Sequence, residues 1–240
     1  MRMLGPYLDE IELLMFEGAA ENLPSKHEIK TLALLAEDLD MSYNVHLPTD
    51  TALTDENPLE ARRAAEVIFR VMDLTAPLSP STHTLHLPYD ENSREKTRVE
   101  RWQERARKNL RHLLSFGINS KSISVETLDY PFEWAEQIII DLDLTVCIDI
   151  GHLIRYEFPV DGILSKYSDM TSIIHFHGVS TEKQDHIALN HLSNHHMELV
   201  MQKLKRFANT VSLEVFSYSN LNNSLMFLEK CWKKGKDRKT

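Results

Sequence analysis

The sequence predicts an α/β protein of the TIM-barrel type, with residues 1–240 forming a single (β/α)-barrel catalytic domain. Short apolar or β-branched runs alternate with amphipathic segments of helical period, a pattern typical of parallel strands joined by helices. No glycine-rich nucleotide-binding loop interrupts this alternation, which favours a closed barrel over a doubly wound sheet. The 240 residues, of which 42% are hydrophobic, are enough for one such core.

Seven runs are predicted as strands, and helical or polar sequence separates each from the next. They are Glu10–Glu17, Ser42–Leu47, Thr82–Leu87, Ser122–Thr127, Thr145–Ile150, Ser172–His177 and Val211–Phe216. The clearest predicted helices are Pro58–Leu74, with proline in its first turn, and Arg94–Leu114. The eightfold barrel has one strand more, so the sequence leaves open that the first strand is missing and the barrel is open at one seam.

Charge and cysteine content argue against several functional classes. Lys and Arg total 27 and Asp and Glu total 36, giving a formal charge of −9, and no basic stripe is available for nucleic acid. The basic cluster Lys233–Lys239 is predicted to be a frayed, solvated tail. Asp141, Asp143 and Asp149 interrupt the longest apolar stretch, so no membrane span is expected. The 2 cysteines provide no disulfide framework, which fits a cytoplasmic location.

Potential metal ligands recur at the ends of six predicted strands. Alternate residues of a barrel strand face the interior, and if the large apolar residues face outward, the last inward residues are His46, His86, Glu126, Asp149, His177 and Glu214. His175 has the same inward phase as His177, one inward position earlier. Barrel enzymes carry their active sites at the carboxyl ends of the strands. We therefore expect these six side chains to converge on one pocket there.

The ligand types point to a metal rather than to a structural network. A single His or Glu at a strand end is usually a hydrogen-bonded core group, but burying six together is costly unless they share a cation. Imidazole and carboxylate without thiolate suit Zn²⁺, Mn²⁺, Fe²⁺ or Co²⁺. His152 extends the set through the motif Asp149-Ile-Gly-His, in which the glycine is expected to permit a tight turn toward the barrel mouth. Glu17, which ends the first predicted strand, is either a further ligand or a helix-capping acid.

These motifs resemble those of the xylose-isomerase-like TIM-barrel superfamily, which includes endonuclease IV, sugar isomerases and ketose 3-epimerases, over Glu10 to Leu228. The resemblance to the endonuclease-IV-like members implies a cluster of divalent ions. Matched in chain order, its ligands are His46, His86, Glu126, Asp149, His152, His177, Asp185, His186 and Glu214. The family separates its loop Asp/His pair by one residue, whereas Asp185 and His186 are adjacent, so both are second-tier candidates.

Within this superfamily, the phrases HLPTD, SVETLDYPFEW, CIDIGHL, IHFHGV, KQDH and SLEVFS are most similar to the cobamide-remodelling phosphodiesterases. That resemblance implies hydrolysis of the phosphodiester in the nucleotide loop of a cobamide by about two or three divalent ions. Glu126 is the candidate to bridge two of the ions, and Glu126 and Glu214 are the candidate catalytic residues. The cobamide is then a substrate, and no organic cofactor is required.

The alternative is a single-metal sugar isomerase or ketose 3-epimerase. Such an enzyme needs one ion held by Glu126, Asp149, His177 and Glu214, with the two glutamates moving protons on either face of the sugar. It does not need the two histidines of the early strands, which therefore separate the two hypotheses. A DNA-repair endonuclease shares the whole cluster but is disfavoured by the net charge, and a non-catalytic metal-binding scaffold is the least favoured alternative.

Overall fold

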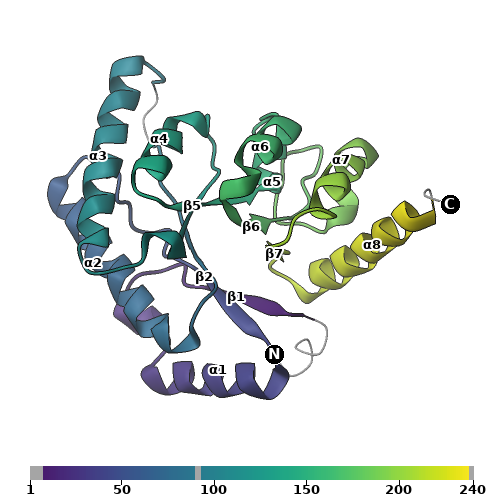
Figure 1. Cartoon of the computed structure of the whole chain (residues 1–240), viewed down its shortest axis with the longest axis horizontal. Coiled ribbons are helices and arrows are strands. Elements are labelled where there is room, and N and C mark those ends of the chain that lie inside the picture. Colours follow the sequence, from purple (N-terminus) through teal and green to yellow (C-terminus); the bar gives the residue numbers. More distant parts are fainter. Residues whose placement is uncertain (1–7, 90–92, 238–240) are drawn as a thin grey trace. The chain divides into compact units, whose positions relative to one another are not determined.

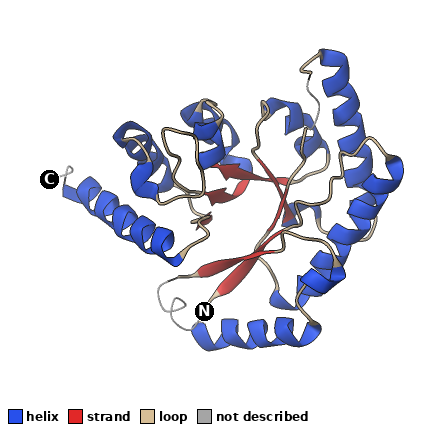
Figure 2. Cartoon of the chain, turned by 180° about the vertical axis from the view of Figure 1, so that it is seen from behind, coloured by secondary structure: helices blue, strands red, loops and turns tan. Residues whose placement is uncertain are grey.

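Strands and helices alternate along the chain in the computed structural model, which describes residues 8–89 and 93–237 (Figure 1). The described part holds a 7-stranded sheet whose strands follow the order of the chain, β1 to β7. Helices lie between successive strands (Figure 2). The predicted α/β fold class of the TIM-barrel type is therefore confirmed. The chain divides into two compact units, residues 1–146 and 147–240, and each is described by itself. The single-domain assignment stays a prediction.

The described part of the first unit holds four parallel strands and four α-helices, besides short 3₁₀ helices. The strands are β1 (Glu10–Leu14), β2 (Ser42–His46), β3 (His83–Leu85) and β4 (Ile123–Glu126), and the helices are α1 (Lys26–Leu39), α2 (Pro58–Thr75), α3 (Lys96–Leu114) and α4 (Glu133–Asp141). Parallel pairing sets His46 opposite Thr84, and Thr84 opposite Ser124. This register places the ends of β2, β3 and β4 side by side, which is what positions the side chains that follow.

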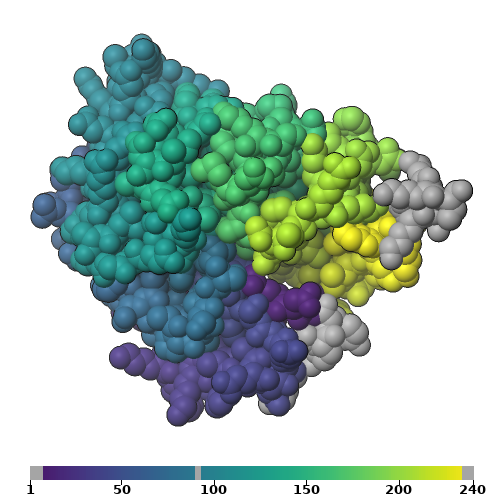
Figure 3. All heavy atoms as spheres, viewed as in Figure 1, coloured from purple at the N-terminus to yellow at the C-terminus, as the bar shows by residue number. Residues whose placement is uncertain are grey.

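Local sequence signals define the helices of the first unit. Ser25 and Glu28 form a capping box at the start of α1, and the Asn57 side chain accepts a hydrogen bond from the Leu59 amide at the start of α2. Ile29 of α1 packs against Tyr43 of β2. In the space-filling view, the side chains of α2 and α3 form a continuous outer surface of this unit (Figure 3).

The second unit holds the remaining elements. They are α5 (Ile150–Arg155), α6 (Val160–Tyr167), β6 (Thr171–His175), α7 (Asn194–Leu204), β7 (Thr210–Ser212) and α8 (Tyr218–Asp237), while β5 (Thr145–Asp149) crosses the boundary between the units. β6 and β7 are parallel, with His175 opposite Ser212. After β6 the chain forms a loop that is closed by an antiparallel bridge between Gly178 and Ile187.

The strands are shorter than the sequence predicts. β3 ends at Leu85 rather than Leu87, β6 at His175 rather than His177, and β7 at Ser212 rather than Phe216. The alternation of apolar and polar residues continues past each of these points, so the pattern alone does not show where parallel pairing stops. As a result His86, His177 and Glu214 lie just beyond strand ends rather than within strands.

Two further predictions concern the tail and the membrane. The helix α8 continues to Asp237, so the prediction of a frayed tail from Lys233 onward is wrong for the residues up to that point, since helical hydrogen bonding extends through the basic segment. No helix in residues 8–89 and 93–237 combines the length and the apolar character needed to cross a bilayer.

Candidate metal centres

The first unit brings two imidazoles onto one buried carboxylate. His46 ends β2, Glu126 ends β4 and His86 follows β3 by one residue. Nε2 of His86 lies 2.7 Å from Oε2 of Glu126, and Nε2 of His46 lies 3.3 Å from the same oxygen. Glu126 is 0% exposed and His46 is 2% exposed, while the rim of the group is formed by His86, whose side chain is 23% exposed. We call His46, His86 and Glu126 the early-strand group.

The early-strand group has the ligand types that could hold a divalent ion. One ligand atom from each of its three side chains lies within 4.8 Å of the others. Nδ1 of His46 lies 3.0 Å from the carbonyl oxygen of Leu47, and donation of a proton to this oxygen leaves the Nε2 lone pair facing Glu126. Such outer hydrogen bonds commonly fix the tautomer of a metal-binding histidine.

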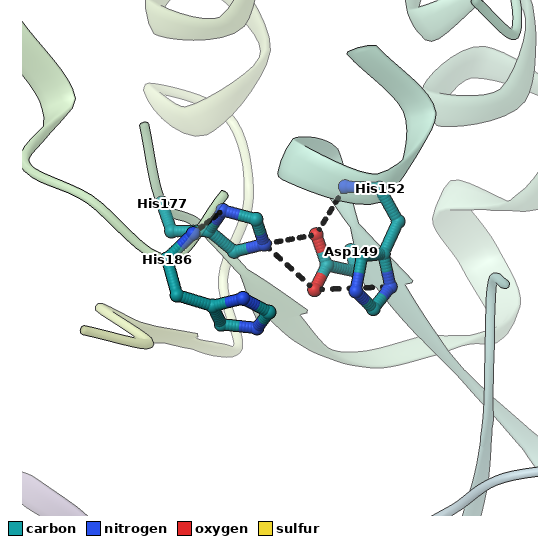
Figure 4. Close-up of side chains that lie close together, drawn as sticks. All are labelled: Asp149, His152, His177 and His186. Atoms are coloured by element: carbon teal, nitrogen blue, oxygen red, sulfur yellow. Dashed lines mark hydrogen bonds and ion pairs between the residues drawn. The ribbon is translucent and has the colours of Figure 1, made fainter. Parts of the chain in front are cut away.

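The second unit holds a separate group around Asp149, formed by Asp149, His152, His177 and His186 (Figure 4). Nε2 of His177 lies 3.1 Å from Oδ1 and 3.2 Å from Oδ2 of Asp149, and Nδ1 of His152 lies 3.4 Å from Oδ2. Asp149 ends β5 and caps α5, because its Oδ1 accepts a hydrogen bond of 2.7 Å from the His152 amide. We call these four residues the Asp149 group.

Gly151 leaves space for the ring of His177 because it has no side chain. The sequence suggests a glycine that permits a tight turn, but Gly151 lies inside α5 and has no positive φ. A Cβ at this position would lie 2.0 Å from Cε1 and 2.3 Å from Nδ1 of His177. The motif Asp-x-Gly-His therefore needs glycine so that the ring of His177 can lie against the first turn of the helix.

His175 is a candidate that the sequence-based ligand set omits. It is 0% exposed, and its Nδ1 lies 3.2 Å from Oε2 of Glu214, which is 6% exposed. Nε2 of His186 lies 3.5 Å from the same oxygen. The inward phase that His175 shares with His177 is the signal that could have found it, since Glu214 and His175 meet where β6 and β7 end.

The two second-tier candidates have different partners. His186 belongs to the Asp149 group, with its ring stacked on that of His177 at a centroid distance of 4.1 Å. Asp185 forms an ion pair with Arg155 at the end of α5, and its Oδ1 lies 3.3 Å from Nδ1 of His186. Asp185 thus contacts a cation of the chain and a neighbouring imidazole.

Glu17 lies outside both groups. It follows β1 in an exposed loop, where its Oε2 accepts a hydrogen bond from the Asn22 side chain. β1 ends at Leu14, and the following 3₁₀ helix, Ala20–Asn22, has Ala19 at its N-cap with no side-chain cap, so Glu17 does not cap this helix. Glu17 is also absent from the groups of described residues that could hold a metal ion.

We expect divalent ions to stabilise the protein against heat. An ion that binds only the folded chain, at about 100 times its dissociation constant, adds about 2.7 kcal/mol. For a chain of this size that corresponds to a rise in Tm of about 5–10 °C. Thermal unfolding followed by circular dichroism, with Zn²⁺, Mn²⁺, Fe²⁺ or Co²⁺ and then with excess chelator, measures the shift and its reversal. The same Tm under all these conditions would contradict the assignment of both groups.

Comparisons with known proteins support the fold and the superfamily. A family model described as xylose isomerase-like TIM barrel matches residues 8–234. A solved D-tagatose 3-epimerase-like protein is 17% identical with a TM-score of 0.78, covering 100% of this chain and 94% of its own. D-psicose 3-epimerase from Clostridium cellulolyticum H10 is 12% identical with a TM-score of 0.69, covering 96% and 91%.

A third solved structure is that of the IOLI protein with a bound zinc atom, 14% identical with a TM-score of 0.71, covering 97% of this chain and 88% of its own. No curated protein sequence matches the chain. Identities this low show the fold alone. None of these comparisons supports the narrower resemblance to the cobamide-remodelling group.

Proposed function

Because the chain belongs to the xylose isomerase-like TIM-barrel family, we propose that it is a divalent-metal enzyme acting on a small molecule, and that its reaction is hydrolysis of a phosphodiester. One observation carries the choice of reaction. Each unit has its own set of His and carboxylate ligands, the early-strand group in one and the Asp149 group in the other. Two such groups in one chain suit an enzyme with more than one ion, as in phosphodiester hydrolysis, better than an enzyme with a single ion.

The residues of each group would hold an ion through imidazole nitrogen and carboxylate oxygen, a donor set that suits Zn²⁺, Mn²⁺, Fe²⁺ or Co²⁺. When bound, such ions polarise phosphoryl oxygens, lower the pKa of water and stabilise the leaving oxygen. Glu126 would keep His46 and His86 with their Nε2 atoms turned toward a common point. Asp149 would likewise hold Nδ1 of His152 and Nε2 of His177 close together. The burial of both carboxylates strengthens these interactions because it excludes water.

A sugar isomerase or ketose 3-epimerase is the second candidate, and the similarity to solved epimerases favours it. In this mechanism one ion would be held by Glu126, Asp149, His177 and Glu214, and the two glutamates would also move protons on either face of a bound sugar. His46 and His86 have no task in this mechanism. The approach of these two imidazoles to one buried glutamate is the reason we place hydrolysis first.

The proposed substrate is a small molecule rather than a nucleic acid, because the formal charge of −9 opposes a polyanion. Intact cobamide is the specific substrate implied by the sequence phrases, and it belongs in the test beside simpler phosphodiesters. The cysteine content is the basis for proposing a cytoplasmic location.

The experiment combines metal analysis with turnover. Purified protein is analysed for bound ions and then assayed with intact cobamide, with bis-p-nitrophenyl phosphate, and with D-psicose, D-tagatose and D-fructose. About two or more ions per chain with phosphodiester cleavage is the expected result. One ion per chain with interconversion of ketoses and no cleavage would overturn the hydrolase and establish the epimerase. Glu126→Gln should inactivate either enzyme, and Glu133→Gln on exposed α4 is its matched control.

A further inference from the structure

We propose that Asp185 is a positioning residue rather than a metal ligand. In this proposal its carboxylate orients the imidazole of His186, and Arg155 fixes the carboxylate for that task. The proposal rests on the proposed function in one respect, that a divalent ion binds the Asp149 group.

The two nitrogens of His186 face two different carboxylates. Nδ1 lies 3.3 Å from Oδ1 of Asp185, and Nε2 lies 3.5 Å from Oε2 of Glu214. When Nδ1 donates its proton to Asp185, the lone pair of Nε2 is on the side away from Asp185 and is available to an ion. A carboxylate in this position fixes the tautomer and raises the basicity of a metal-binding imidazole.

The ring of His186 has little freedom to turn by itself. It is stacked between His177, at a centroid distance of 4.1 Å and an interplanar angle of 16°, and Phe216, at 4.8 Å and 18°. Its backbone has a φ of 52°, and its amide donates a hydrogen bond of 3.0 Å to Nδ1 of His177. The stack fixes the plane of the ring. In the proposal, Asp185 determines which of the two ring nitrogens carries the proton.

The two oxygens of Asp185 have separate partners. Oδ2 pairs with the guanidinium of Arg155, while Oδ1 faces His186. The ion pair is partly shielded, with side chains that are 35% exposed for Arg155 and 17% exposed for Asp185. To bind an ion directly, Asp185 would have to exchange a charged partner for the metal. Because Asp185 is adjacent to His186 in sequence, it is well placed to act on the imidazole instead.

The same loop supplies a matched control. Lys183 pairs with Glu157 at 2.8 Å, also linking the loop to the chain just after α5, but these side chains are 59% and 76% exposed. Exposed ion pairs contribute little. Loss of the Lys183 pair therefore reports on a general loosening of the loop, whereas loss of the Arg155 pair reports on Asp185.

The test compares affinities for Zn²⁺ and Co²⁺ in Arg155→Gln, Asp185→Asn, the double variant and Lys183→Gln. Loss of an outer partner of a metal ligand typically lowers affinity about 10-fold to 100-fold. We expect a loss in this range for Arg155→Gln and for Asp185→Asn, and no further loss in the double variant, because both changes break one unit. Lys183→Gln should stay within about twofold of the unmodified chain.

A metal affinity of Arg155→Gln that is unchanged or higher than that of the unmodified chain would overturn the proposal. If Asp185 were a ligand restrained by Arg155, removing the guanidinium would free the carboxylate and leave affinity unchanged or raise it. Arg155→Lys, which keeps the charge, should give an intermediate loss and serves if the glutamine variant does not fold. The absorption bands of bound Co²⁺ give a second criterion. If Asp185 is not a ligand, the bands of the Asp185→Asn variant should have the same positions as those of the unmodified chain, and if Asp185 is a ligand they should shift.

Failure of the metal assignment itself has a different signature. Asp149→Ala should lose an ion that the unmodified chain binds. If the two bind equal numbers of ions, the Asp149 group is not a metal site and the proposed function fails. If Asp149→Ala loses the ion while Arg155→Gln and Asp185→Asn retain full affinity, only the role of Asp185 is wrong.

Discussion

Replacing His86 by alanine is expected to lower phosphodiester turnover at least about a hundredfold, even with Mn²⁺ or Zn²⁺ present in excess. Nε2 of His86 lies 2.7 Å from Glu126, and its loss leaves His46 as the only imidazole of the early-strand group. An ion that stabilises charge in the transition state contributes several kcal/mol, and each 1.36 kcal/mol corresponds to a tenfold change in rate. The loss should therefore appear in kcat, measured with intact cobamide or bis-p-nitrophenyl phosphate.

His27→Ala is the control for this variant, because His27 lies exposed on α1 in the same unit. It should keep full turnover and the full number of bound ions. In a single-metal epimerase, by contrast, His86→Ala would mainly raise KM for the sugar and leave kcat near its starting value. Undiminished hydrolysis by His86→Ala would rule out the multi-metal mechanism.

Strand phase explains how much of the early-strand group could be predicted. His46 and Glu126 are the last residues of β2 and β4, as the alternation of apolar and polar residues indicates. His86 was found by the same phase although β3 stops one residue before it. Nε2 of His86 lies 2.7 Å from Glu126, so this side chain faces the end of β4 although the predicted strand is too long.

The second unit was harder to predict because its contacts depend on a loop. Phase places His175 and His177 on the same side of the predicted strand, and only the structure shows that His175 contacts Glu214 and His177 contacts Asp149. The partner of Asp185 could not be predicted either. Arg155 lies 30 residues earlier, at the end of α5, whereas Asp185 lies in a loop, and no periodicity within the sequence connects the two.

The structural reason for a glycine also cannot be predicted from the sequence. At Gly151 this reason is the basis for the second large expected effect. Gly151→Ala places a Cβ 2.0 Å from Cε1 of His177, a ring that is 0% exposed and held by Asp149. Either the ring leaves Asp149 or α5 shifts, so we expect a loss of about 1–3 kcal/mol in the free energy of unfolding. The variant should also lose the ion of the Asp149 group, measured by metal analysis beside urea denaturation.

Gly162→Ala in α6 is the matched control, since it makes the same change in an exposed helical position. Its nearest neighbour is Cβ of Pro159 at 3.7 Å, an ordinary contact. Alanine there should raise stability by about 0.5–1 kcal/mol, because glycine loses more conformational freedom in a helix. The two substitutions are thus expected to have opposite signs. A Gly151→Ala chain as stable as Gly162→Ala, with its ions retained, would show that His177 does not occupy the position on which the Asp149 group depends.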